Sequence, residues 1–321
     1  HRIKKTKILA IDEISMISAN LLELLDIVFK AVRNSNLPMG GMQVLFFGDF
    51  LQLPPVNKGV EEVSFCFSSS VWKELNLSNI ILKQIFRQQD MKFIKILNNL
   101  RVGKIDDEDK EVLKSRIKGD EKNNDAIKPT ILTTHNNKAE SINNEEMGKI
   151  NLPKQLYQAT YEGVVDRIEH LKKNCLAQDN LLLKINAQVM MIKNTYQKDG
   201  IINGSLGVVR DFSVKKNYPI VEFVNGSLLT ISPEEWLIER FDELKQEMII
   251  EAKMTQIPLV ASWAITIHKS QGLTLDKIYC DLSDIFTAGQ AYVALSRARN
   301  IENVFIKGIN FNKIYNLQIF F

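Results

Sequence analysis

The sequence predicts an α/β protein built on parallel sheets, with a small β-rich module inserted in its second half. Two short apolar runs without polar alternation, residues 8–11 and 44–47, are typical of strands buried on both faces of a parallel sheet. A segment with helical periodicity lies between them, and two parallel strands joined by a helix form a βαβ unit. From about residue 185, short strand-like runs separated by glycines replace this pattern.

Composition limits the classes of function. The chain has 321 residues, 45% of them apolar, which is enough for a large core in two or three domains. Lys and Arg number 41 against 38 Asp and Glu, so the net charge of +3 excludes a histone-like polycation but not a protein with a local basic groove for nucleic acid. No apolar run approaches the roughly 18 residues of a membrane span, so we expect no membrane partner. Three scattered cysteines and four histidines give no disulfide framework or metal-binding spacing.

The first half contains these elements in order. Ser18 is expected to open a helix with apolar residues at spacings of three and four, as far as Val32. Pro38 separates this helix from the strand at 44–47, and Pro54 follows because proline cannot continue a central strand.

The second half begins with another α/β unit. A helix is expected from about residue 90 to 103, then a charged, solvated helix and loop over 106–125, then a strand at 130–133. The β-rich module contributes four strand-like runs, at residues 188–193, 206–212, 220–224 and 228–231.

Turn dipeptides and a proline delimit the module. Asn203-Gly204 and Asn225-Gly226 are strong turn signals, and the runs between them predict a small barrel over about 186–257. After Pro258 the α/β pattern returns, with strands at 260–267 and 278–282 and a helix through Leu295. The module is therefore expected to be inserted within the second α/β domain.

Two carboxylates follow the first strand. Asp12 and Glu13 are expected at its carboxyl end, where open α/β sheets bind ligands. The first can hold Mg²⁺ and the second can position or polarise a water molecule, as nucleotide hydrolysis requires. The alternative is a strand that simply ends in a polar loop.

The second strand ends in a related way. Gly48 allows a sharp turn, which presents Asp49 and Gln52 beside the carboxylates of the neighbouring strand. A glutamine at this place can contact a terminal phosphate. The alternative is a proline-terminated loop with incidental polar groups.

Near the C-terminus, Thr287 and Gln290 are spaced as a capping box for a helix carrying Arg297 and Arg299. Residues two apart do not share a helix face, so only one arginine can point into a given cleft. An arginine that reaches a nucleotide on another domain would act as an arginine finger; the alternative is a surface arginine.

A polar run, residues 268–272, follows the apolar strand expected at 260–267. Its hydroxyl, amide and cationic groups suit contacts with a phosphate backbone, so we expect it to bind DNA through His268, Lys269, Ser270 and Gln271, together with Thr266 of the preceding strand. A single histidine beside a strand end is otherwise more often structural.

Together, these segments and their order resemble the Pif1 family of superfamily 1B DNA helicases. The matching segments are residues 8–15, like Walker B; residues 37–56 (LPMGGMQVLFFGDFLQLPPV), like the family signature running into motif III; residues 85–88, like motif IV; residues 266–275, like motif V; and residues 290–298 (QAYVALSRA), like motif VI. Residues 203–208 and 256–259 are similar to parts of the family's SH3-like 2B module.

The resemblance implies a domain plan. Residues 1–80 would be the C-terminal part of a first, truncated RecA-like domain, 1A. Residues 81–185 and 258–321 would form a second RecA-like domain, 2A, with an SH3-like barrel inserted at 186–257.

The resemblance also implies roles around ATP and Mg²⁺. Asp12 would anchor the metal, Glu13 would activate water, and Gln52 would sense the γ-phosphate. Arg87 and Arg297 would reach the nucleotide from the second domain. Asp49 and Gly272 complete the implied nucleotide contacts.

The implied function is an ATP-dependent helicase that moves 5′→3′ on single-stranded DNA. It would unwind duplex, forked or G-quadruplex DNA in repair, recombination and telomere maintenance, as a monomer in the nucleus or mitochondrion.

One departure bears on this function. The 321 residues contain no G-x-x-x-x-G-K-[ST] sequence, so we expect a fragment that lacks the upstream phosphate loop and is inactive alone. Two alternatives stay open: a RecD-type or relaxase-type helicase of the same superfamily, and a single-strand-binding scaffold that does not hydrolyse ATP.

Overall fold

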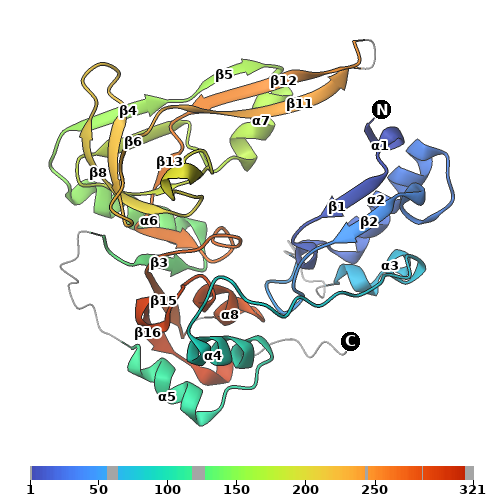
Figure 1. The fold of residues 1–321 in the computed structure, drawn as a ribbon, viewed down its shortest axis with the longest axis horizontal. Coiled ribbons are helices and arrows are strands. Elements are labelled where there is room, and N and C mark those ends of the chain that lie inside the picture. The colour runs from blue at the N-terminus through green and yellow to red at the C-terminus, as the bar shows by residue number, and fades with distance from the viewer. Residues whose placement is uncertain (1, 56–63, 118–126, 243–244, 284, 315–321) are drawn as a thin grey trace.

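The structure is a computed structural model and describes residues 2–55, 64–117, 127–242, 245–283 and 285–314. Its N-terminal part stands apart from the rest of the chain, joined to it by an extended segment that leads to α4 (Figure 1). A parallel sheet with its helices and a β-rich part make up the remainder, so the α/β class with parallel sheets is confirmed. No helix in the described ranges has both the length and the apolar character of a membrane span.

The N-terminal part is the predicted βαβ unit. Strand β1 (Ile8–Ile11) pairs in parallel with β2 (Gln43–Phe46), and α2 (Ala19–Arg33) connects them. Ser18 caps α2 as predicted, because its side chain accepts a hydrogen bond from the Leu21 amide at 3.2 Å. Two short helices complete this part, α1 (Arg2–Lys5) and α3 (Ser70–Glu74).

Burial of this small sheet differs from the prediction. Leu9 and Val44 face the cluster formed with α2, whereas their neighbours point away from it and Ile8 is 54% exposed. The expectation of strands buried on both faces was wrong for the described residues, because β1 and β2 form a two-stranded sheet that α2 covers on one side. On α2 itself, Leu21 and Val28 are exposed rather than buried.

The second parallel sheet has the order β14-β3-β15-β16. Its strands are β14 (Ala264–Thr266), β3 (Thr130–Thr133), β15 (Ile278–Leu282) and β16 (Val304–Ile309). The helices around it are α4 (Met91–Arg101), α5 (Asp107–Ser115), α6 (Asn136–Lys149) and α8 (Gln290–Leu295). Apolar residues of α4, α5, α8 and this sheet form the largest core cluster.

The β-rich part contains three antiparallel sheets. The first has the order β10-β9-β8-β7-β13, with β10 (Leu228–Thr230), β9 (Pro219–Phe223), β8 (Leu206–Phe212), β7 (Gln188–Met191) and β13 (Leu259–Ala261). The second has the order β11-β12-β5, with β11 (Glu234–Asp242), β12 (Glu247–Gln256) and β5 (Thr160–Gly163). The third pairs β4 (Lys154–Gln158) with β6 (Asn180–Lys184), and α7 (Val165–Asn174) lies between β5 and β6 in the chain.

Strand pairing extends the β-rich part beyond the predicted module. All four predicted runs between 188 and 231 are strands, and Asn225-Gly226 forms the tight turn between β9 and β10. However, β5 pairs with β12, so residues before 186 also belong with these sheets. The SH3-like barrel and the domain limits stay predictions.

The run at 260–267 was predicted as one strand and is two. Strand β13 pairs antiparallel with β7, whereas β14 pairs in parallel with β3. Ser262 lies between them, its amide donating to the Gln188 carbonyl and its carbonyl accepting from the Gln188 side chain at 2.9 Å. A single apolar run therefore serves both the β-rich part and the parallel sheet.

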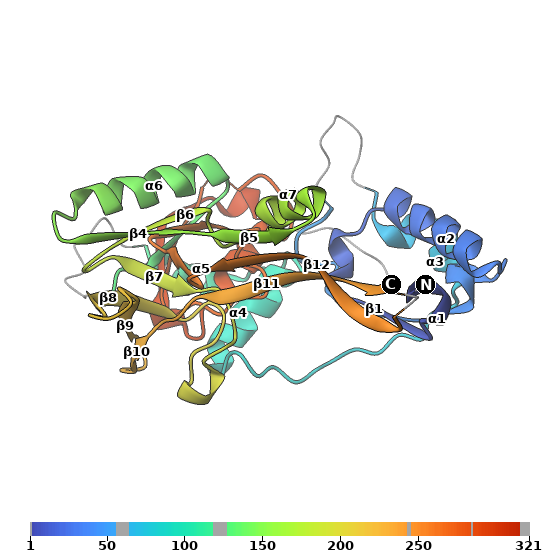
Figure 2. The ribbon, with the colours of Figure 1, turned by 90° about the horizontal axis from the view of Figure 1, so that it is seen from above.

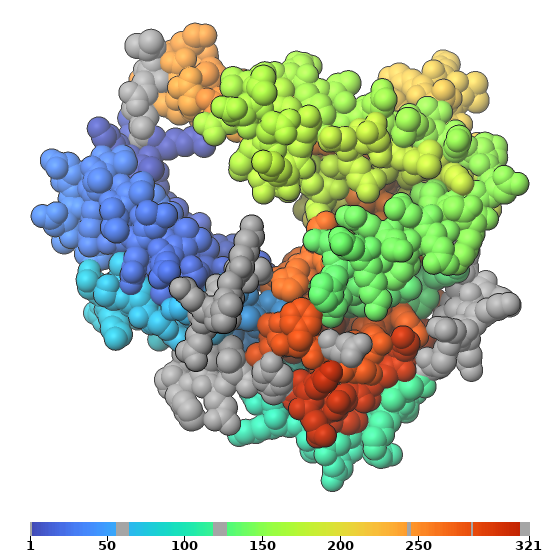
Figure 3. Space-filling view, turned by 180° about the vertical axis from the view of Figure 1, so that it is seen from behind, coloured from blue at the N-terminus to red at the C-terminus, as the bar shows by residue number. Residues whose placement is uncertain are grey.

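The long β11–β12 hairpin reaches the N-terminal part. Both ribbon views show it running toward α1 (Figures 1 and 2). Arg2 donates to the Glu239 carbonyl at 2.7 Å, and the Lys5 ammonium lies 5.5 Å from the centre of the Phe241 ring. Seen from behind, an open space is bordered by the N-terminal part in blue, the β-rich part in yellow-green and an orange segment (Figure 3).

Candidate nucleotide and DNA sites

The carboxyl ends of β1 and β2 meet, as predicted for parallel neighbours. The Ile14 amide donates to the Phe47 carbonyl at 2.9 Å, which joins the segments just after the two strands. Gly48 is required here, because a Cβ at this position would lie 2.9 Å from the Ile14 nitrogen. Asp12 and Glu13 therefore lie beside the turn that carries Asp49 and Gln52.

Glu13 has an unusual backbone conformation and a perturbed carboxyl group. Its φ of 50° lies in the left-handed region, which costs free energy for a residue with a side chain. Its amide donates to the Asp12 carboxylate at 2.9 Å. Burial raises the pKa of Glu13, Asp12 raises it further, and the Arg297 cation opposes this rise. Strain and a raised pKa together are typical of a functional carboxylate.

Residues 49–52 form a turn held by the Asp49 side chain. One Asp49 oxygen accepts from the Leu51 amide at 3.1 Å, and the Gln52 amide donates to the Asp49 carbonyl at 3.0 Å. Both Asp49 carboxylate oxygens also accept hydrogen bonds from Arg101 on α4, each at 2.9 Å. In this structure the Asp49 carboxylate binds an arginine, and its predicted contact with the nucleotide stays a prediction.

The second part is the four-stranded parallel sheet with the helices around it and the segment that leads to α4, and two of its arginines lie within electrostatic reach of Glu13. Arg87 donates to the Thr274 hydroxyl and to the Ser296 carbonyl, both at 3.1 Å. Arg297 is 3% exposed, and it donates to the Val293 carbonyl at 2.9 Å and to the Ser296 hydroxyl at 2.8 Å. These are neutral oxygen acceptors.

The electrostatics of these arginines favour an anion. Burial, and then the neighbouring Arg87 cation, lower the pKa of Arg297 to about 10, while Glu13 opposes this shift. Burial also lowers the pKa of Arg87. Two partly desolvated cations that repel each other would both be stabilised by a bound anion such as a phosphate.

The helix before Arg297 differs from the prediction in its start and its end. Helix α8 begins after Gly289, which has a φ of 74°, and no side chain caps it. The capping box was wrong, because the Gln290 side chain accepts from the Phe286 amide at 3.1 Å and only backbone atoms link Gln290 to Thr287. Since α8 ends at Leu295, Arg297 lies beyond the helix, buried, whereas Arg299 is exposed.

The predicted DNA-binding run follows strand β14. Thr266 is buried and pairs with Thr133 of β3, and its hydroxyl accepts from the Lys269 amide at 3.3 Å. Lys269 is exposed, whereas His268 is half-buried and burial lowers its pKa. Ser270 is fully buried and donates to a backbone carbonyl at 2.8 Å.

The end of this run forms a tight turn. Both polar side-chain atoms of Gln271 are buried without a hydrogen-bond partner in the described structure. Gly272 has a φ of 74° and is exposed, so glycine suits its backbone conformation. The Arg297 guanidinium donates to the carbonyls of Ser270 and Leu273 at 3.4 and 3.5 Å, which links this run to the predicted nucleotide site.

Comparisons with known proteins agree with this arrangement. A family model described as PIF1-like helicase matches residues 1–111, and one described as the 2B domain of DNA helicase Pif1 matches residues 167–212. The chain is 34% identical to the ATP-dependent DNA helicase Pif1 of Bdellovibrio bacteriovorus, over 96% of this chain and 68% of that protein. The chain belongs to the Pif1 helicase family.

Two further Pif1 relatives extend this result. The ATP-dependent DNA helicase PIF1 of Danio rerio is 38% identical over 93% of this chain and 46% of that protein, so the chain spans about half the length of such relatives. The structure of unliganded Pif1 from Bacteroides superposes with a TM-score of 0.86 at 31% identity, over 98% of this chain and 74% of that one. The 2B family model begins its match at residue 167, before the predicted start of the inserted module at 186.

Few of the described residues could coordinate the magnesium ion that the resemblance to Pif1 helicases implies. In the described ranges no three His, Cys, Asp or Glu residues are grouped as a metal cage. Asp12 is exposed at a strand end beside Glu13, and this fits Mg²⁺, which is usually held by one or two carboxylates plus phosphates and water.

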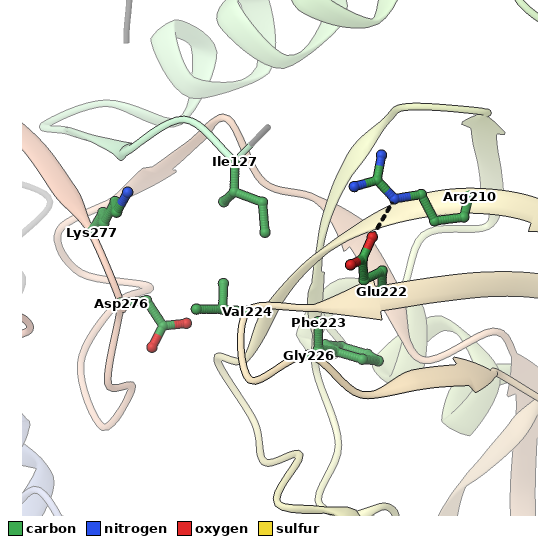
Figure 4. Close-up of a pocket in the computed structure, with 8 residues that line it drawn as sticks. All are labelled: Ile127, Arg210, Glu222, Phe223, Val224, Gly226, Asp276 and Lys277. Carbon is green, nitrogen blue, oxygen red and sulfur yellow. Dashed lines mark hydrogen bonds and ion pairs between the residues drawn. The ribbon is translucent and has the colours of Figure 1, made fainter. Parts of the chain in front are cut away.

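A separate pocket lies outside the set of predicted site residues. It has a volume of about 270 Å³ and is lined by residues of β8, β9 and the segment before β15 (Figure 4). Arg210 and Glu222 form an ion pair of 2.6 Å at its wall, and burial raises the pKa of Asp276. None of the predicted site residues lines this pocket.

Three residues of the nucleotide region were missed by sequence reasoning. Gln88 is buried and donates to the carbonyls of Ser296 and Ala298 at 3.0 and 2.8 Å, which fixes the segment around Arg297. Arg101 binds Asp49, and Tyr292 of α8 is affected electrostatically by both of these residues. The adjacent Arg87 was a signal for Gln88, whereas Arg101 and Tyr292 resemble ordinary helix positions in the sequence.

Proposed function

We propose that this chain is part of an ATP-dependent DNA helicase that couples ATP hydrolysis to 5′→3′ movement on single-stranded DNA. One observation carries the proposal: two partly desolvated arginines of the second part, Arg87 and Arg297, are within electrostatic reach of Glu13 in the N-terminal part. A carboxylate on one domain that faces cations on another suits a nucleotide bound between them.

The chain's own residues would then divide the work on ATP. Glu13, as a carboxylate, would accept a proton from the attacking water, and its raised pKa strengthens it as a base. The Gln52 side chain would contact the terminal phosphate, and Arg87 and Arg297 would stabilise the charge that develops on it. Asp12 would hold Mg²⁺, which when bound neutralises phosphate charge.

Single-stranded DNA would cross the carboxyl ends of β14 and β3. There Lys269 is exposed, and we assign it to a phosphate contact together with His268 and Gln271, whereas the buried Thr266 and Ser270 would hold the turn that carries them. The buried amide of Gln271, which has no hydrogen-bond partner among the described residues, supports a polar ligand at this place. Hydrogen bonds from Arg297 to the Ser270 and Leu273 carbonyls give a direct route from the nucleotide to the DNA-binding run.

The wider role is a proposal that does not depend on the geometry of the site. We propose, from the resemblance to the family, that the complete protein unwinds duplex, forked or G-quadruplex DNA in repair, recombination and telomere maintenance. We further propose that it acts as a monomer, in the nucleus or the mitochondrion.

The test uses the complete gene product. We expect DNA-stimulated ATP hydrolysis and displacement of a strand from a duplex with a 5′ single-stranded tail but not a 3′ tail. Glu13→Gln should abolish both activities, whereas Glu302→Gln, at an exposed position, should change neither. Binding of single-stranded DNA without ATP hydrolysis would favour a DNA-binding scaffold and refute the helicase proposal.

A further inference from the structure

The turn at residues 49–53 comes from the N-terminal part but is held by the second part. Leu53 is fully buried, and it belongs to the large core cluster that includes Phe93 and Leu97 of α4 rather than to the cluster around α2. The residues just after β2 therefore lie against the second part, and Gln52 is on this turn.

Arg101 makes the most specific contact with the turn. It lies at the end of α4, and its Nε and Nη2 atoms donate to the two carboxylate oxygens of Asp49, each at 2.9 Å. This two-point geometry fixes orientation as well as distance. The same carboxylate accepts from the Leu51 amide at 3.1 Å, so Arg101 is connected through Asp49 to the backbone next to Gln52.

The residue just before α8 approaches the same turn independently. At Gly289, a Cβ would lie 2.5 Å from the Gln52 carbonyl oxygen and 2.7 Å from that of Leu51. The backbone of the second part thus approaches the turn from a second side, immediately before the helix that precedes Arg297.

We infer that Arg101 is a positioning residue that acts through Asp49 to orient Gln52 toward the terminal phosphate when the two parts come together. The inference rests on the proposed function, because it assumes that Gln52 contacts ATP. It also gives Asp49 a task other than binding the nucleotide. Arg101 touches neither nucleotide nor water in this scheme, and it transmits the position of α4 to the turn.

A purely structural ion pair is the competing explanation. The side chains of Arg101 and Asp49 are 39% and 16% exposed, so solvent screens the pair only in part and its two-point geometry can stabilise the fold. The two explanations predict different effects of breaking the pair. Loss of a structural pair lowers mainly the unfolding temperature, whereas loss of a positioning pair lowers kcat, because a small misplacement of a catalytic group strongly reduces the rate.

The experiment compares variants of the complete gene product by DNA-stimulated ATPase kinetics. Arg101→Ala is expected to lower kcat by about 10–100-fold with a much smaller change in KM for ATP. Arg101→Lys should fall between, since a lysine keeps the charge but loses the two-point geometry. Lys95→Ala is the matched control, because Lys95 lies on the same helix but pairs with Glu108 of its own part at 2.7 Å.

A double-variant cycle tests the route through Gln52. If Arg101 acts through Gln52, then Arg101→Ala should cause almost no further loss of kcat in a Gln52→Ala background. Fully additive losses would overturn the inference.

Each other outcome is also decisive. A kcat within twofold of wild type for Arg101→Ala, with Glu13→Gln inactive, overturns the role of Arg101 and leaves the proposed function intact. Activity in Glu13→Gln refutes the proposed function itself. If Arg101→Ala does not fold, Arg101→Lys decides alone, and a wild-type kcat for this variant overturns the inference.

Discussion

Replacing Arg297 by alanine separates an arginine finger from a structural arginine. The buried guanidinium donates to the Val293 carbonyl, the Ser296 hydroxyl and, at longer range, the Ser270 and Leu273 carbonyls. Leaving one buried acceptor unsatisfied costs about 1–3 kcal/mol, so the alanine variant should unfold at a lower temperature. We expect the folded variant to keep its affinity for single-stranded DNA nearly intact.

The effect on catalysis should be larger than the effect on stability. Known arginine fingers contribute on the order of 10³–10⁵ in rate. At about 1.4 kcal/mol per factor of ten, this is roughly 4–7 kcal/mol of barrier. Burial lowers the pKa of Arg297 to about 10, which still leaves the guanidinium charged in an assay near neutral pH.

The assay measures kcat at saturating ATP and single-stranded DNA, DNA affinity by fluorescence anisotropy, and the unfolding temperature of the same samples. Arg299→Ala is the control, since Arg299 is exposed two residues away and should cost far less. Equal and mild losses of kcat at the two positions would refute the reasoning, and the catalytic role would then have to move to Arg87.

Three further predictions test the base, the DNA contact and the core. In Glu13→Gln, ATP should still bind while turnover collapses, and turnover within a few-fold of wild type would rule out Glu13 as the base. In the wild type, the ATPase rate should fall as the pH drops through the raised pKa of Glu13, beginning at a higher pH than for an ordinary glutamate. Lys269→Ala should weaken binding equally for all single-stranded sequences and lower the salt slope by about 0.7 per lost phosphate contact, so an unchanged slope would make Lys269 structural. Phe93→Ala should lower the free energy of unfolding by about 3–5 kcal/mol in urea titrations, because this side chain is fully buried on α4. Met91→Ala, exposed on the same helix, should change it by less than about 0.5 kcal/mol, and similar losses at both positions would contradict the burial.

The features that could be predicted from the sequence depend on local patterns. Apolar runs located β1, β2 and β15, and the rule for parallel strands placed Asp12-Glu13 beside the turn that follows β2. The N-cap at Ser18 was also predictable, because a cap depends on residues three apart.

The features that could not be predicted depend on distant contacts. Asp49 and Arg101 are 52 residues apart, and nothing in either neighbourhood marks them as partners. The apolar run that divides into β13 and β14 looks continuous, because both halves are buried, although in different sheets. Thr287 and Gln290 had the spacing of a capping box, but the Gln290 side chain binds the Phe286 amide instead.

Because the β11–β12 hairpin is long, a small rotation at its base produces a large displacement at its far end. At about 3.3 Å per residue, the ten residues of β12 span roughly 30 Å. A rotation of about 10° at its base would therefore move the far end by roughly 5 Å, which exceeds the length of any hydrogen bond. The contacts of Arg2 with Glu239 and of Lys5 with Phe241 can exist only within a narrow range of angles between the β-rich and N-terminal parts. A pair of spectroscopic labels at these positions would therefore report a small change in the angle between the β-rich and N-terminal parts as a large change in the distance between the labels.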